Sequence, residues 1–214
     1  MRAITVMVAT VLLAFWPALT GAQCDQCEGD FNGDGQVTIN EIIVAVNNAL
    51  KNCPTPEPRF TDNRDGTITD TRTGLQWEKK SNDSSIHDQD NTYTWSTGSP
   101  FDPDGTAFTT FLTTLNSAPC FAGHCDWRLP GVTELQSLVD YGRFAPAVDA
   151  AFNTRCTPGC TVLTCSCTIL DYYWSVPALA DLPNFAWNVD FNYGYVNGFE
   201  KTLAYSVRAV RNRS

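Results

Sequence analysis

Residues 60–77 read FTDNRDGTITDTRTGLQW. Two short stretches containing Phe, Thr and Ile flank Arg64-Asp65-Gly66, and an Asp-Gly pair between such stretches is a strong β-hairpin signal. Asp65 is therefore predicted to form a turn rather than to bind a metal. Thr73-Gly74 marks a second turn before a strand at residues 75–77. This stretch predicts a domain that opens with three short strands joined by turns.

The main domain, residues 59–214, combines two predicted helices with several further strands. Apolar residues recur at helical spacing in residues 106–115 and 133–141. These residues are Phe108, Phe111, Leu112 and Leu115 in the first helix, and Leu135, Leu138 and Val139 in the second. Strand-like alternation occurs at three later places, namely residues 172–175, 186–191 and 205–210, and a turn at residues 192–194 leads the second of them back into residues 195–196. Few helices beside many short strands predict an α+β fold.

Residues 30–41, DFNGDGQVTINE, match a calcium-binding loop. Oxygen-bearing side chains occupy loop positions 1, 3 and 5, glycine occupies position 6 and a carboxylate occupies position 12, as in loops that surround calcium with oxygen ligands. The candidate calcium ligands are Asp30, Asn32, Asp34, Gln36 and Glu41. Glu41 is also expected to form a helix-capping box with Thr38, and both roles are compatible because position 12 lies in the first turn of the next helix.

The calcium loop lies in a small module, residues 23–53, followed by a proline-rich linker at residues 54–58. An apolar stripe predicts one helix after the loop, formed by Ile39, Ile42, Ile43, Val46 and Leu50. Such a short module cannot bury a sizeable core, so metal and a disulfide from Cys24 or Cys27 to Cys53 are expected to order it. The module resembles half of a dockerin, the duplicated calcium module of cellulosome enzymes, but no second copy of the repeat is found.

Residues 1–22 have the features of a secretory signal peptide: Arg2, an apolar run over residues 4–19 and a small-residue cleavage site at Thr20-Gly21-Ala22. A membrane anchor is the first alternative, although the run is shorter than the roughly 20 apolar residues of a spanning helix. A lipoprotein signal before Cys24 is the second. No later segment is long and apolar enough to cross a membrane. The protein is therefore expected to be secreted, at the cell surface or in the periplasm.

Charge and cysteine content narrow the class of partner. The formal net charge of −9 disfavours nucleic acid and anionic lipid, and suits divalent cations or neutral ligands held by aromatic rings and hydrogen bonds. Nine cysteines in an exported chain predict disulfides, with one cysteine left over. The expected bridges are Cys120–Cys125 and two local pairs among Cys156, Cys160, Cys165 and Cys167. Zinc at Cys24-x-x-Cys27 or Cys165-x-Cys167 is the alternative.

Several motifs of the main domain resemble the Legionella collagen-like protein C-terminal (Lcl C-terminal) domain family. They are residues 60–77, 91–95, 120–130, 173–175 and 207–211. The resemblance implies a C-type-lectin-like fold, related in outline to formylglycine-generating enzymes, and a bacterial exported protein. The named family member is an adhesin that binds sulfated glycosaminoglycans. This chain departs from it because no collagen-like repeat precedes the domain and because its acidic balance disfavours a polyanion.

The main domain contains basic, histidine and aromatic side chains that are candidates for catalysis or ligand binding. The basic side chains at Lys79, Lys80, Arg208, Arg211 and Arg213 are predicted to be solvated. Neither His87 nor His124 lies in a nucleophile motif, and His87 is expected in a solvated loop.

Residues 187–190, Trp-Asn-Val-Asp, only imitate the Trp-Asn-Asp triplet of calcium-dependent lectins and predict a strand with Trp187 and Val189 inward. Aromatic residues that can stack on sugars if exposed, or otherwise belong to the core, are Tyr93, Trp95, Tyr193 and Tyr195.

These observations favour a secreted, non-enzymatic binding or adhesion protein that recognises a surface glycan or protein through the lectin-like domain. The first alternative is a structural or assembly protein that docks to a partner chain through the calcium module. The second is a cysteine-dependent oxidase related to formylglycine-generating enzymes.

Calcium binding by the N-terminal module can be tested on the full chain. We expect calorimetry to record heat at calcium concentrations of about 10⁻⁴–10⁻³ M, the range of extracellular modules. Chelation should increase protease cleavage within residues 23–53, because the metal orders the module. Combining Asp30→Ala with Asp34→Ala removes two ligands and should abolish both effects. No heat at millimolar calcium, together with unchanged cleavage on chelation, would contradict the assignment.

Overall fold

The computed structural model describes residues 37–51 and 58–213. The chain divides into two units, residues 1–57 and residues 58–214. Several predicted features lie outside the described residues: the signal peptide, the candidate ligands Asp30, Asn32, Asp34 and Gln36, and Cys24, Cys27 and Cys53. In the first unit the structure therefore describes a single element, helix α1, with the residues just before it.

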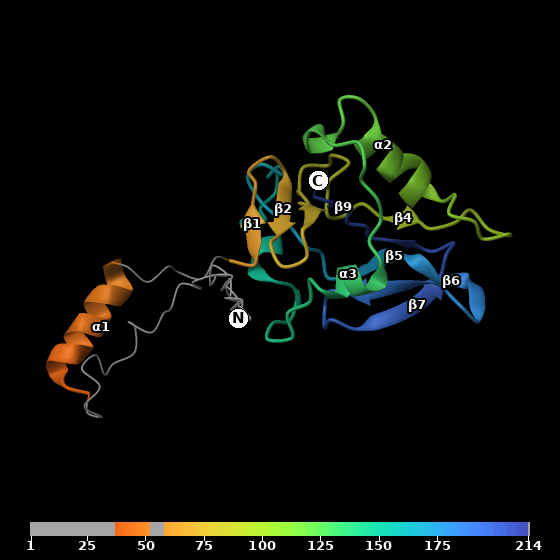
Figure 1. The fold of residues 1–214 in the computed structure, drawn as a ribbon. Coiled ribbons are helices and arrows are strands. Elements are labelled where there is room, and N and C mark those ends of the chain that lie inside the picture. Colours follow the sequence, from red (N-terminus) through yellow and green to blue (C-terminus); the bar gives the residue numbers. More distant parts are fainter. Residues whose placement is uncertain (1–36, 52–57, 214) are drawn as a thin grey trace, which may run out of the picture. The chain divides into compact units, whose positions relative to one another are not determined.

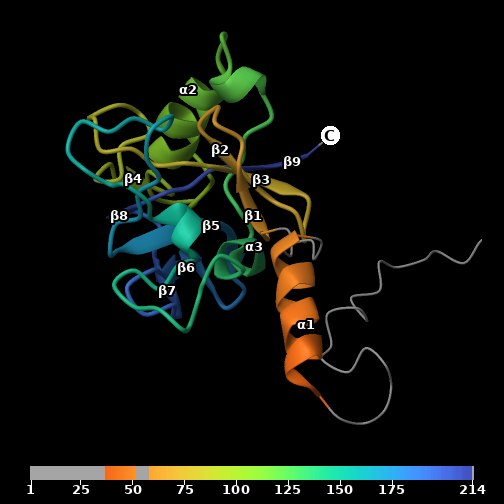
Figure 2. The ribbon, with the colours of Figure 1, turned by 90° about the vertical axis from the view of Figure 1, so that its left-hand side faces the viewer.

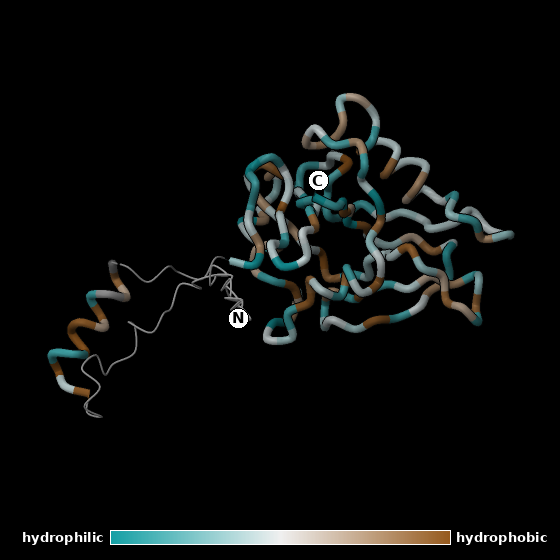
Figure 3. The backbone as a smooth tube through the Cα atoms, viewed as in Figure 1, coloured by the Kyte–Doolittle hydropathy of each residue, from teal (hydrophilic) through white to brown (hydrophobic). Residues whose placement is uncertain are grey.

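Helix α1 spans Ile39–Lys51, as its apolar periodicity predicts. Its start is capped by Thr38, whose backbone N–H and hydroxyl both donate to Glu41 Oε2 at 2.8 Å, while Glu41 N donates to Thr38 Oγ1 at 3.4 Å. The predicted capping box is confirmed. Hydrophobic and hydrophilic residues alternate along the helix (Figure 3). Its apolar stripe is between 49% and 78% exposed at Ile39, Ile42, Ile43, Val46 and Leu50.

The second unit opens with a four-stranded antiparallel sheet. Its order is β1 (Phe60–Asp62), β2 (Thr67–Asp70), β3 (Leu75–Glu78) and β9 (Val210–Asn212). The predicted hairpin joins β1 to β2. Gly66 has φ +97° and Asp65 Oδ1 accepts from Thr67 N at 3.0 Å, so Asp65 forms the turn as predicted. β9 lies beside β3 (Figure 2), so the last strand completes a sheet that begins at Phe60.

A three-stranded antiparallel sheet contains β5 (Tyr172–Leu179), β6 (Leu182–Asp190) and β7 (Val196–Glu200). The predicted strands at residues 172–175 and 186–191 coincide with β5 and β6, and the turn at residues 192–194 leads into β7 as expected. A small sheet pairs β4 (Tyr93–Thr94) with β8 (Ala204–Tyr205).

The prediction of one strand over residues 205–210 is wrong. β8 ends at Tyr205 and β9 begins at Val210, in a different sheet. Between them the chain crosses from one sheet to the other, and Arg208 is fully buried there instead of continuing a strand's alternation.

Short helices occupy the connections between the sheets. They are η2 (Ala107–Leu112), a π-helix that continues into α2 (Thr113–Asn116), then α3 (Val132–Gln136) and the 3₁₀ helices η3 (Phe121–Gly123) and η4 (Ala150–Phe152). The first predicted helix is confirmed. The second was expected to reach Tyr141 but ends at Gln136, because the chain turns there to pair Val139 with Val148. Figure 1 shows α2 on the opposite side of the domain from β7.

Two hydrophobic clusters fill the domain on opposite faces of the β5–β6 pair. Tyr173 and Val189 face the first cluster, whereas Trp174 and Ala186 face the second, because successive side chains of a strand alternate between its faces. The first cluster also contains Ile68 and Trp77 from β2 and β3, and the second contains side chains of η2 and α2. Mixed helix and sheet around these clusters confirm the α+β class.

A buried arginine between β8 and β9 joins strand β3 to the cysteine-rich insertion. Arg208 Nη1 donates to the backbone oxygen of Glu78 at 2.8 Å, and Nη2 donates to Cys167 O at 2.7 Å and to Thr168 Oγ1 at 2.9 Å. Its guanidinium lies over the ring of Phe152, 5.2 Å from the ring centroid. The next residue's N–H donates to the Glu78 carboxylate at 2.9 Å. One side chain thus bonds to polar groups of two segments, residue 78 and residues 167–168, that are distant in sequence from it and from each other.

Replacing Arg208 tests how far the fold depends on this contact. Arg208→Met leaves buried carbonyl oxygens unpaired and should reduce the free energy of unfolding by about 3–5 kcal/mol, measured by urea denaturation. Arg213→Met changes an exposed arginine in the same tail and should cost less than about 0.5 kcal/mol. Equal stability of the two variants would show that the buried guanidinium does not organise the domain.

Candidate binding surface

Glu41 is the one predicted calcium ligand within the described residues. Its side chain is 8% exposed and lies in the first turn of α1, the place that position 12 of such a loop requires. One carboxylate oxygen accepts from Thr38, so capping and the proposed ligation use the same group. Calcium binding stays a prediction.

His87 belongs to a buried charged cluster, not to the solvated loop that was expected. Its side chain is 14% exposed, its ring lies 4.2 Å from that of Phe121, and Nδ1 lies 2.7 Å from Glu78 Oε1. Lys80 Nζ approaches the same oxygen at 3.3 Å. Burial opposes the charge of Glu78, but the Lys80 charge and the His87 hydrogen bond hold the pKa of Glu78 below its usual range. Burial lowers the pKa of Lys80. Since Glu78 and Lys80 are inaccessible, this cluster supports the fold rather than contacting a ligand.

The prediction that the basic residues are solvated is wrong for four of the five. Lys79, Lys80, Arg208 and Arg211 are each at most 4% exposed, and Arg213 alone among the five is exposed. Their charges are compensated locally: Lys79 Nζ lies 2.9 Å from Asp62 Oδ2, and Arg211 Nε donates to Asp126 Oδ1 at 2.7 Å. These basic side chains therefore provide almost no positive surface for a polyanion.

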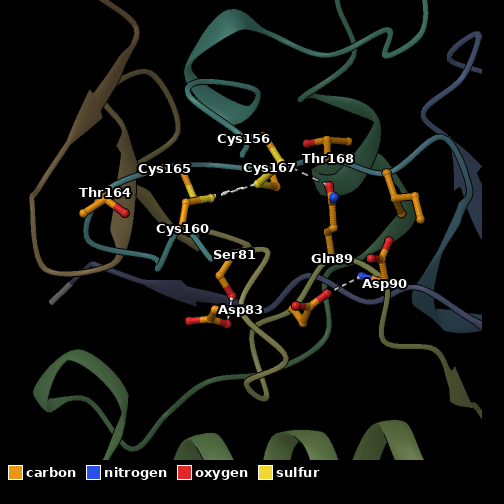
Figure 4. Close-up of a disulfide and its surroundings, with 12 residues drawn as sticks. Ser81, Asp83, Gln89, Asp90, Cys156, Cys160, Thr164, Cys165, Cys167 and Thr168 are labelled. Atoms are coloured by element: carbon orange, nitrogen blue, oxygen red, sulfur yellow. Dashed lines mark hydrogen bonds between the residues drawn. A yellow bond between two sulfur atoms is a disulfide. The ribbon is translucent and has the colours of Figure 1, made fainter. Parts of the chain in front are cut away.

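Three disulfides lie within the described residues: one is the predicted Cys120–Cys125 pair, and the other two are local bridges among the four cysteines of the insertion, as expected, with a pairing that the sequence left open. Cys120 bonds to Cys125, Cys156 to Cys167 and Cys160 to Cys165. In Figure 4 the last two bridges lie side by side, with 3.8 Å between the sulfurs of Cys160 and Cys167. The sulfur of Cys165 is used in a bridge, so the alternative zinc site at Cys165-x-Cys167 is not supported.

The lectin-like triplet is not arranged to hold a ligand. Asn188 is fully buried in the middle of β6, between Trp174 of β5 and Asn197 of β7. Asp190 is 7% exposed and accepts a hydrogen bond from Asn192 N at 2.7 Å. Val189 is buried as predicted, whereas Trp187 is only partly buried. The side-chain amide of Asn188 is therefore out of reach of a sugar.

Exposed aromatic residues gather in one region of the domain. Of the predicted stacking residues, Tyr93 and Trp95 are core residues, whereas Tyr193 and Tyr195 are 55% and 61% exposed. Sequence reasoning missed two more, Tyr141 and Phe144, which are 69% and 77% exposed. Tyr141 was expected inside a helix, and its exposure depends on the early end of α3. Among the described residues, every exposed Phe, Tyr or Trp belongs to this set, here called the aromatic patch: Tyr141, Phe144, Tyr193 and Tyr195.

Backbone contacts fix the two segments of the aromatic patch beside each other. Ala145 N donates to Asn192 O at 3.0 Å and Ala147 N to Phe191 O at 2.7 Å. The hydroxyl of Tyr141 donates to Gly194 O at 3.2 Å. Gly194 has φ +84°, and a Cβ there would come within 2.5 Å of Val139 Cγ1, so glycine is required at this close approach. The turn is therefore locked against the ring of Tyr141.

The aromatic patch contains two angled rings, and another of its residues, Phe144, borders an open cavity. The ring centroids of Tyr193 and Tyr195 lie 6.0 Å apart with an interplanar angle of 35°. Phe144 borders a cavity of about 330 Å³, which is also lined by Arg143, Pro146 and Asn153. Arg143 Nε lies 3.1 Å from Asp140 Oδ2, so the nearest charges compensate each other. The patch therefore exposes four aromatic rings, three of them with hydroxyl groups, beside one compensated pair of charges.

Residues 66–211 match the Lcl C-terminal domain family. The chain belongs to this family. The match covers the domain that holds the aromatic patch, and it confirms the family that the motifs indicated. Comparisons with curated proteins and with solved structures found no match. In the part of the chain that the structure describes, no helix has the length and apolar character needed to span a membrane.

The Lcl C-terminal domain contains carboxylates whose charge the fold stabilises. Burial opposes the charges of Asp62 and Asp70, but hydrogen bonds from Lys79 and Arg59 hold the pKa of each carboxyl below its usual value. Arg59 binds Asp70 through both carboxylate oxygens, at 3.0 and 2.6 Å. A carboxylate with a lowered pKa contributes its stability above the pKa of the unfolded chain, about 4, and loses it as the pH falls through the folded value.

The domain should therefore lose stability in acid. We expect the melting temperature to be nearly constant from pH 7 to pH 5 and to fall progressively below about pH 4. Asp70→Asn should lower the melting temperature at pH 7 and make its decline below pH 4 shallower, because one titrating group is removed. Melting curves recorded by circular dichroism at pH 7, 5, 4 and 3 test this pH dependence. A melting temperature that is unchanged at pH 3 would contradict this account.

Proposed function

We propose that this chain is an exported, non-enzymatic recognition protein that binds a glycan or a protein on a surface through its Lcl C-terminal domain. The observation that carries the proposal is the concentration of exposed aromatic side chains in two adjoining segments. Contiguous exposed apolar patches on soluble proteins commonly mark interaction sites. The three disulfides are compatible with the oxidising exterior or periplasm that the predicted signal peptide implies.

We also propose the C-type-lectin-like fold that the family resemblance implies. The α+β composition and the pairing of the last strand, β9, with β3 near the start of the domain support it. In such a fold, recognition is expected from loops held on a rigid scaffold, and the aromatic patch lies on loops of this kind. We propose that the chain is not an enzyme, because neither His87 nor His124 lies in a nucleophile motif.

Binding by the full chain tests this function. The probes are an array of uncharged and charged glycans, and intact cells. We expect the wild type to bind at least one class of probe, and the combined Tyr193→Ala and Tyr195→Ala substitutions to weaken that binding at least tenfold, as loss of a tyrosine anchor typically does.

The matched control combines Leu163→Ala with Leu182→Ala. These residues are 61% and 48% exposed, and they lie in the cysteine-rich insertion and at the end of β6 far from Asp190. The control should bind as the wild type does. If the wild type binds none of the probes, or if both double variants behave alike, the proposed function is wrong.

A second candidate function is assembly with a partner chain through the calcium module. The exposed apolar stripe of α1 favours it, because an amphipathic helix normally buries that face. Sedimentation of the full chain with a candidate partner, with calcium and with chelator, separates the two functions. Calcium-dependent association that is lost on Ile43→Gln, with the aromatic patch intact, would favour assembly.

A further inference from the structure

We propose that the aromatic patch binds uncharged glycan chains, with Tyr193 and Tyr195 as stacking platforms and Tyr141 as the residue that positions them. This inference rests on the proposed recognition function and specifies its ligand class. It concerns residues that form no part of the buried charged cluster or of the disulfides.

The charges around the patch argue against an anionic ligand. The two segments, residues 139–147 and 190–196, contain three charged residues: Asp140, Arg143 and Asp190. The single cation, Arg143, is already paired with Asp140. Of the five basic residues predicted to be solvated, four are buried, and none of the five lies in the two segments of the patch. With a net charge of −9 for the chain, a sulfated or carboxylated chain would be repelled rather than steered to this surface.

The openness of the patch argues against a cationic ligand. Aromatic recognition of an ammonium group depends on rings that surround and desolvate it. Tyr141, Tyr193 and Tyr195 are each more than half exposed, and the 35° angle between the last two rings forms an open wedge. The carboxylate of Asp190 is 7% exposed and hydrogen-bonded within its own turn. No enclosed anionic cage is formed by these residues.

An uncharged sugar is the ligand class that suits the exposed tyrosine rings of the patch. A sugar ring presents C–H groups on its faces and hydroxyl groups at its rim, and a tyrosine presents an apolar face and a polar edge. Three of the four residues in the patch are tyrosines. A stable protein interface buries about 800 Å² on each side. The aromatic patch has four residues, against roughly 20–30 residues a side in such an interface, and Leu163 and Leu182 lie outside both of its segments.

The patch is organised before the ligand arrives. Within the turn, Gly194 N donates to Asp190 O and Asp190 N donates to Tyr195 O, both at 2.8 Å. The Tyr141 hydroxyl adds a bond to Gly194 O, the carbonyl between the two stacking tyrosines. Rigid rings lose little conformational entropy on binding, which favours weak, non-ionic contacts of this kind.

The test measures affinity of the full chain for an array of uncharged oligosaccharides, including glucose and N-acetylglucosamine oligomers, with heparin as the anionic arm. We expect binding to one or more uncharged chains, with a Kd that changes less than twofold between 50 and 500 mM salt. Combined Tyr193→Ala and Tyr195→Ala should weaken it at least tenfold, while combined Leu163→Ala and Leu182→Ala should not. Tyr141→Phe keeps the ring but removes the hydroxyl, and should weaken binding about threefold or more with an unchanged melting temperature.

Each of the other outcomes would refute a different part of the proposal. Binding of heparin alone, with affinity falling steeply in salt, would refute the ligand class but leave the recognition function standing. So would binding to cells that persists after their glycans are removed enzymatically. Uncharged glycans that bind the tyrosine double variant as well as the wild type would refute the site. If Tyr141→Phe lowers the melting temperature and affinity together, or changes neither, Tyr141 is not a positioning residue. Absence of binding to every probe, cells included, would refute the proposed function itself.

Discussion

The buried guanidinium of Arg208 is the constraint on which the rest of the domain depends. Its hydrogen bonds reach the backbone of β3 and the insertion at residues 167–168, and its own segment connects β8 to β9. A charge removed from water must be compensated by specific partners, and here those partners come from separate parts of the chain. These partners are met where β3, the insertion and the segment between β8 and β9 come together.

The charged cluster around Glu78 extends the same principle. Glu78 accepts hydrogen bonds from Ala209 N and from Lys80, and lies within hydrogen-bonding distance of His87 Nδ1. Basic side chains that the sequence predicts to be solvated are thus buried inside the domain, where they contact partners within the protein. The consequence reaches the surface, because Lys79, Lys80, Arg208 and Arg211 are not available to an anionic ligand. Interior electrostatics and ligand preference are therefore connected in this protein.

The loops are made rigid by disulfides and backbone contacts rather than by buried charges. The cysteine-rich insertion is held by two adjoining disulfides and by backbone bonds to residues 80–82. The turn of the aromatic patch has no disulfide. It is held by backbone hydrogen bonds and by the close approach of Gly194 to Val139 and Tyr141. The disulfides and the backbone contacts both reduce the number of conformations that these loops can adopt. The backbone contacts of the aromatic patch do so while leaving its tyrosine rings exposed to solvent.

Interactions between residues that are close in the sequence could be predicted from the sequence. The Asp65-Gly66 turn, the Thr38–Glu41 capping box, the helix around Phe111 and the short-range cysteine pairs each depend on residues within about a dozen positions of one another. The α+β class and the family follow from the order of such local signals. Gln36 and the other candidate ligands before Thr38 lie outside the described residues, so the calcium site remains a prediction from the sequence.

Tertiary structure alone decided which charges are buried and which aromatic rings are exposed. Arg208 meets the backbone of Glu78 across 130 positions of sequence, and Tyr141 meets Gly194 across 53. Periodicity cannot reveal such partners, because alternation records which side of an element a residue occupies and not what lies opposite it. For the same reason the strand expected over residues 205–210 was interrupted, and the helix expected to reach Tyr141 ended at Gln136. The sequence determined the elements, whereas long-range pairing determined the surface that they present.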